Sequence, residues 1–165
     1  PTLAETRRLT ARRTRRTPGL TDTHQTMAVE LTDEARQYAG RFADVTGVTP
    51  RDCLVRAGGE RLAVVVPSGE KGTAVGPAGA TVERAERLLS VSIDVIEYAD
   101  TPADFLANAL APAAVRGVTV SRQGVAFAEV VETDRGVAVG EDGHRIDLAR
   151  ELLARHFGVD DVELT

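Results

Sequence analysis

The 165-residue chain can form one medium-sized domain or two small ones, and its 42% hydrophobic residues suffice for a buried core. Its single cysteine excludes an intrachain disulfide and a multi-cysteine metal site, and the three histidines show no metal-ligand spacing. The net charge is −5, and 19 of the 20 basic residues are arginine, a composition that resembles proteins of salt-loving archaea. No stretch approaches the ~20 apolar residues of a membrane span, and no signal-peptide pattern opens the chain, so we expect a cytoplasmic protein without a membrane partner.

Residues 1–26 are rich in threonine and arginine and lack apolar periodicity, which predicts a disordered basic arm. Met27, the only methionine, stands just before the first periodic segment. This placement indicates that the arm is an extension ahead of the natural start. Two alternatives stand for it: an arm that contacts phosphate groups, and a start-site artefact.

A helix, two strands, a glycine loop with its helix, and a last strand are expected over residues 27–99. Apolar residues recur at helical spacing over 31–45, after Thr32 as an N-cap. Two apolar runs, 53–55 and 62–66, flank a glycine turn and predict a hairpin in which Cys53 is a small core residue. The last strand is expected over 92–98.

The same order of elements is expected over residues 100–165. Thr101 caps a helix that Pro102 opens, and strands are expected over 118–120, 125–131 and 162–164. The helix after the second glycine loop should end near His156, which we expect to interact with the helix dipole at that end. The helix-surface arginines Arg84, Arg87 and Arg150 are expected to pair with the neighbouring Glu83, Glu86 or Glu151.

The glycine loop and the helix after it occur twice, 64 residues apart. The matching pairs are Lys71/Arg135, Gly72/Gly136, Ala74/Ala138, Val75/Val139, Gly76/Gly140, Gly79/Gly143, Val82/Ile146, Ala85/Ala149, Leu88/Leu152 and Leu89/Leu153. A duplicated order of helix, strand, strand, helix, helix and strand predicts an α+β protein. Each three-stranded sheet would be covered by helices on one face, and the short connection between the copies predicts that they pack tightly together.

Each glycine loop has the properties of a phosphate site. Glycine at both hinges permits a sharp turn, and the helix that follows presents unpaired N–H groups and a positive dipole end. A single G-x-x-G pattern is more often only a hinge, but its duplication favours a function. The sequence has no dinucleotide or nucleoside-triphosphate loop pattern and no nucleophile–base–acid set, so we expect neither a cofactor, nor a metal, nor catalysis.

The loops A-V-G-P-A-G and A-V-G-E-D-G, the segment 96–100, the segment 110–113 and the ending 154–161 resemble the archaeal NusA-like proteins, from about Leu31 to Thr165. The resemblance implies two tandem prokaryotic-type (type II) KH domains, at 27–99 and 100–165. It also implies a monomeric factor in transcription termination or antitermination that grips single-stranded RNA at its G-x-x-G loops. RNA polymerase and the ribosome are the protein partners that it implies.

The resemblance places RNA contacts in both loop regions. In the first they are Lys71, Val75, Gly76, Pro77, Ala78, Gly79 and Val82, and in the second Arg135, Val139, Gly140, Glu141, Asp142, Gly143, His144 and Arg145. The family's loops typically carry lysine between the glycines, whereas these loops carry Pro77-Ala78 and Glu141-Asp142. The two acids stabilise the helix start but repel a phosphate. The first loop is therefore the stronger RNA candidate. One alternative is that the second copy docks on RNA polymerase or the ribosome while only the first touches RNA, and another is a ribosome-associated or RNA-processing role.

Overall fold

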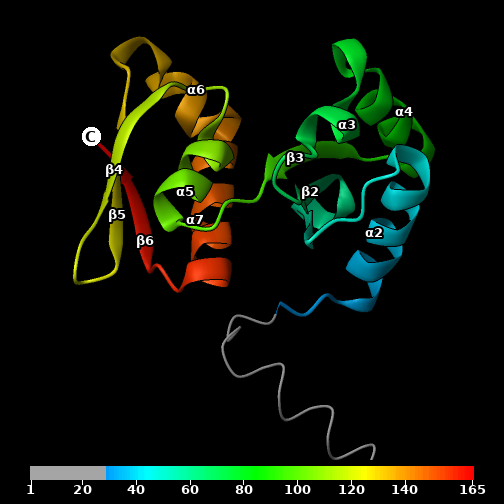
Figure 1. The fold of residues 1–165 in the computed structure, drawn as a ribbon, viewed down its shortest axis with the longest axis horizontal. Coiled ribbons are helices and arrows are strands. Elements are labelled where there is room, and N and C mark those ends of the chain that lie inside the picture. The colour runs from blue at the N-terminus through cyan, green and yellow to red at the C-terminus, as the bar shows by residue number, and fades with distance from the viewer. Residues whose placement is uncertain (1–28) are drawn as a thin grey trace, which may run out of the picture. The chain divides into compact units, whose positions relative to one another are not determined.

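The computed structural model describes residues 29–165, of which Leu31–Thr165 form one compact unit. Two three-stranded sheets with helices packed on them make a mixed α+β fold, which confirms the α+β part of the predicted fold class (Figure 1). The predicted arm at 1–26 lies outside the described residues. Within 29–165, no helix has both the length and the apolar character needed to span a membrane.

The first copy contains the predicted helix, hairpin and final strand. Its elements are α2 (Asp33–Thr46), β1 (Asp52–Arg56), β2 (Arg61–Val66), α3 (Lys71–Val75), α4 (Ala80–Leu89) and β3 (Ser92–Glu97). The Thr32 hydroxyl accepts a hydrogen bond from the Ala35 amide at 3.0 Å, which confirms the predicted N-cap. Strand β2 is central, antiparallel to β1 and parallel to β3.

The second copy repeats this topology with different lengths. Its elements are α5 (Pro102–Leu110), β4 (Val115–Val120), β5 (Val125–Val130), α6 (Arg135–Val139), α7 (His144–Phe157) and β6 (Asp161–Leu164). Strand β5 is antiparallel to β4 and parallel to β6, and α5 and α7 cover the sheet (Figure 1). Strand β4 begins at Val115, earlier than the predicted 118, and the irregularity between Val115 and Gly117 interrupts the apolar alternation on which the prediction rested.

Central strand β2 is buried on both faces, and this explains its unbroken apolar run. Leu62, Val64 and Val66 join the core formed with α2, α3 and α4. Ala63 and Val65, on the opposite face, join the core of the second copy. The first sheet therefore serves two cores, and the predicted tight packing of the copies is observed.

Cys53 lies in the first core with 1% of its surface exposed, as predicted. Burial, assisted by the charge of Asp52, raises the pKa of its thiol to about 12. Because the thiolate is the reactive form, we expect iodoacetamide to alkylate Cys53 at pH 8 at least about a hundredfold more slowly in the folded protein than in denaturant. Mass spectrometry of timed samples measures both rates. Equal rates would mean that β1 opens readily.

Candidate nucleic-acid interface

The two glycine loops have nearly the same backbone although their middle residues differ. Gly76 and Gly140 lie at φ 78°, ψ 172° and φ 81°, ψ 169°. Gly79 and Gly143 are left-handed, at φ 78° and 75°. The third loop residue is left-handed in both copies, alanine at 78 and aspartate at 142. The duplication seen in the sequence therefore extends to the loop conformation.

The first glycine of each loop is fixed by close packing as well as by its backbone angles. A Cβ on Gly76 would lie 2.1 Å from the Thr81 hydroxyl oxygen, and one on Gly140 would lie 2.7 Å from the Arg145 amide nitrogen. The second glycine has room, since a Cβ on Gly79 would come no closer than 3.7 Å, to Glu83. Only the first glycine is thus sterically obligatory.

The helix that follows each loop begins without a side-chain cap. Gly79 precedes α4 and Gly143 precedes α7, and neither can supply a side-chain acceptor to the first-turn amides. Unpaired amides at a helix start are donors for an anion, and the dipole adds to their attraction. The amides of Gly79 and Gly143 already donate to the carbonyls of Gly76 and Gly140 at 3.1 Å, and those of Ala80 and His144, the first helical residues, donate to Pro77 and Glu141, so part of each helix start is already paired.

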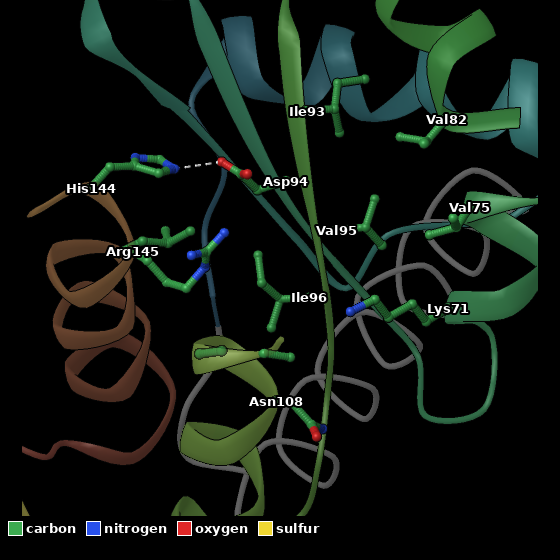
Figure 2. A pocket seen from close by; sticks show the side chains of 13 residues that line it. Lys71, Val75, Val82, Ile93, Asp94, Val95, Ile96, Asn108, His144 and Arg145 are labelled. Atoms are coloured by element: carbon green, nitrogen blue, oxygen red, sulfur yellow. Dashed lines mark hydrogen bonds and ion pairs between the residues drawn. The ribbon is translucent and has the colours of Figure 1, made fainter. Parts of the chain in front are cut away.

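An open pocket of about 220 Å³ lies beside the first loop (Figure 2). Its aliphatic wall is formed by Val75, Val82, Ile93, Val95 and Ile96, with Ala109, Ala111 and Leu148 completing it. Lys71, Asp94, Asn108, His144 and Arg145 supply the polar groups. Aliphatic walls with a few polar groups suit the face and edge of an unstacked base.

Five of the predicted contact residues line this pocket, and they come from both copies: Lys71, Val75, Val82, His144 and Arg145. Pro77 and Ala78 are exposed at the loop tip. The structure thus brings the start of α7 to the groove of the first copy. It does not bring Arg135, Val139, Glu141 or Asp142 to the pocket wall.

His144 connects the two copies (Figure 2). Its Nε2 lies 2.8 Å from the Asp94 carboxylate, and its Nδ1 lies 3.2 Å from Nη1 of Arg56. A guanidinium only donates, so Nδ1 must accept and the Nε2–H donates to Asp94. This bridging position could not be predicted from the sequence, because nothing local to His144 marks partners 50 and 88 residues away.

The cations of the second loop region are largely engaged by the protein itself. Arg145 donates to the Val137 carbonyl at 2.5 Å, and Arg135 donates to the Thr165 carbonyl at 3.0 Å. Glu141 and Asp142 are exposed, and so are 38% of Val137 and 38% of Val139. The second loop therefore presents acidic and apolar groups rather than free cations.

The expected pairing of helix arginines with adjacent glutamates is wrong for Arg150. Arg150 bridges Asp147 and Asp161 at 3.1 Å each. Glu151 instead faces Arg56 of the first copy at 3.5 Å. Arg150 therefore pairs with an aspartate one turn away on its own helix and with an aspartate on β6, while Glu151 pairs with an arginine on β1.

A buried carboxylate, Asp52, joins the first sheet to the end of α7. It is 0% exposed and accepts from Arg155 at 2.6 and 2.9 Å and from His156 at 2.8 Å. Burial acts to raise the pKa of Asp52, but the hydrogen bonds from His156 and Arg155 outweigh it and hold the pKa at about 2. His156 lies in the last turn of α7, as predicted, and its side chain is buried against Asp52.

Known proteins resemble this chain over most of its length. The probable transcription termination protein NusA of Halobacterium salinarum is 47% identical over 141 residues, which cover 84% of this chain and 100% of that protein. The protein of the same name from Methanocaldococcus jannaschii is 32% identical over 139 residues, covering 82% of this chain and 75% of its own. No family model matches the chain.

A solved structure shares the fold. The crystal structure of APE1850 matches with a TM-score of 0.71 and 30% sequence identity, over 82% of this chain and 100% of that one. The mixed α+β arrangement of two three-stranded sheets fits a KH-like fold.

Proposed function

Because the chain belongs to the archaeal NusA-like transcription termination proteins, we propose that it binds single-stranded RNA in transcription termination or antitermination, through two tandem type II KH domains at 27–99 and 100–165. The observation that carries the proposal is the pair of G-x-x-G loops with matched backbones, the first of which lies beside an aliphatic pocket. The protein works as a cytoplasmic monomer alongside RNA polymerase and catalyses no reaction.

The first loop holds the RNA most directly. A base lies against the aliphatic wall formed by Val75, Val82 and Val95, and a backbone phosphate lies at the uncapped start of α4. Lys71, the only lysine in the chain, stands at the edge of the same pocket. Apolar contact with a base does not depend on counterion release, so this mode suits a protein with the acidic, lysine-poor composition of a salt-loving organism.

Replacing Gly79 with aspartate tests the first loop. The new Cβ has room, and the left-handed backbone costs about 1 kcal/mol of strain. Its charge at the start of α4 opposes a phosphate, so we expect affinity for single-stranded RNA to fall about tenfold or more. Fluorescence anisotropy with a labelled oligonucleotide measures the affinity, and circular dichroism verifies the fold. Unchanged affinity would refute RNA binding at this loop.

The matched variant Gly143→Asp separates two modes of action. An aspartate there adds one charge beside Glu141 and Asp142, which already oppose a phosphate, so we expect less than about a threefold change in RNA affinity. The exposed acids and half-exposed Val137 and Val139 favour a second candidate function for this copy, docking on RNA polymerase or the ribosome. A large RNA effect of Gly143→Asp would argue against docking as the role of the second loop.

A further inference from the structure

A second pocket, of about 310 Å³, lies where the β1–β2 hairpin of the first copy meets the start of α7. It is lined by Val55, Arg56, Ala57, Arg61, His144 and Glu151. His144 also lines the pocket beside the first loop, so the two pockets adjoin at this imidazole. Two guanidinium groups therefore stand directly beyond the groove of the first copy.

The donors of these two arginines are only partly used. Arg61 donates through Nη2 to both oxygens of Asp94 at 3.2 Å. Its Nε is buried and has no hydrogen-bond partner within residues 29–165. Arg56 contacts His144 through Nη1 and approaches Glu151 through Nε, at 3.2 and 3.5 Å. The buried Nε is closed to a ligand, so the donors that can serve one in the pocket are the remaining guanidinium N–H groups of Arg56 and Arg61.

The acids around this pocket have partners and do not need a cation. Asp94 already accepts from Arg61 and His144. Glu151 is half-exposed and pairs with Arg56. The unpaired groups in the pocket are therefore donors, and they need a ligand with several acceptor oxygens. A planar guanidinium matches phosphate oxygens in geometry and charge.

We propose that this pocket binds, through the guanidinium groups of Arg56 and Arg61, a backbone phosphate of the RNA strand as it leaves the groove of the first copy. The inference rests on the proposed RNA binding. It identifies the part of the RNA-binding surface that supplies a phosphate contact in place of the acidic second loop. Glu141 and Asp142 repel a phosphate at the start of α7, whereas the two arginines attract one at the junction between the copies. The strand thus crosses to the second copy without needing its acidic loop.

The test compares Arg56→Gln and Arg61→Gln with the control Arg36→Gln. Arg36 is an exposed helix arginine paired with Asp33 and lies outside both pockets. Two single-stranded RNAs are titrated, one of about four nucleotides, the length one KH groove clamps, and one of about ten. We expect each junction variant to weaken the longer RNA about fivefold or more and to reduce its salt slope by about 0.7, with the shorter RNA and the control unchanged.

Two other results of the titration would overturn the proposal. Unchanged binding of the longer RNA removes the phosphate site, and equal losses for both lengths show a general effect on the fold. If the wild-type protein binds neither RNA, the proposed function itself fails. Titration of the protein with inorganic phosphate, followed through the NMR signal of the Arg61 Nε–H, then tests whether the pocket binds an anion independently of RNA. A shift of the signal supports an anion site, and an unchanged signal refutes it.

Discussion

Replacing Gly76 with alanine is expected to lower the free energy of unfolding by about 3 kcal/mol or more. The new Cβ would lie 2.1 Å from the Thr81 hydroxyl oxygen and 2.8 Å from its backbone nitrogen, so α4 would have to move. The backbone angles of φ 78° and ψ 172° belong to a region that essentially only glycine occupies. Steric crowding and backbone strain therefore add at one position.

The matched change Gly79→Ala should cost only about 1 kcal/mol, because its Cβ has space and its conformation is merely left-handed. Denaturant unfolding followed by circular dichroism measures both variants in the salt at which the protein is folded. Gly140→Ala and Gly143→Ala repeat the comparison in the second copy. If Gly76→Ala costs no more than Gly79→Ala, close packing against Thr81 is not what requires glycine in the first position.

The repeat and its glycine hinges could be predicted because their signals are local. Apolar spacing, the Thr32 and Thr101 caps and the duplicated loop indicated the helices, the strands and their order before any contact was known. The positive φ at the hinges also follows from glycine itself. Local spacing does not say which glycine of a pair is enclosed by the next helix, since that depends on how α4 packs on the loop.

The contacts between the copies could not be predicted in the same way. Asp52 and His156 are 104 residues apart, and each alone reads as an ordinary strand or helix residue. Helix α7 has 14 residues where α4 has 10, and its last turn carries Arg155 and His156. The two copies match only up to Leu89 and Leu153, so nothing in the repeat indicates what the longer end of α7 contacts.

The acidic second loop is connected to the first copy through the start of α7. Glu141 and Asp142 indicated weaker phosphate binding at that loop, but they did not indicate which other surface an RNA strand would contact. The structure places the start of α7 against the first copy, with His144 between two pockets. The proposed RNA contact and the observed contact between the copies therefore share one helix end, and a change there is expected to affect both.

Replacing Asp52 with alanine is expected to destabilise the protein by about 3–5 kcal/mol. The change leaves His156 buried and Arg155 partly buried without the carboxylate that both contact. The control Asp33→Ala removes an exposed carboxylate that pairs with Arg36 and should cost about 1 kcal/mol or less. Denaturant unfolding at neutral pH compares the two, and similar losses would show that the buried network adds little to stability.

The pH dependence of the wild-type protein gives an independent measure of the same carboxylate. Its pKa of about 2 in the folded protein lies below the ordinary value of 3.8, so the unfolded chain takes up the proton first. The stability contributed by Asp52 is therefore fully present above pH about 4 and is lost as the pH falls towards 2, an effect of roughly 2 kcal/mol. Unfolding free energies measured across this range should decline less steeply in Asp52→Ala than in the wild type. Parallel curves would mean that Asp52 titrates in the folded protein as it does in the unfolded chain, and that its contacts with Arg155 and His156 do not favour the charged form.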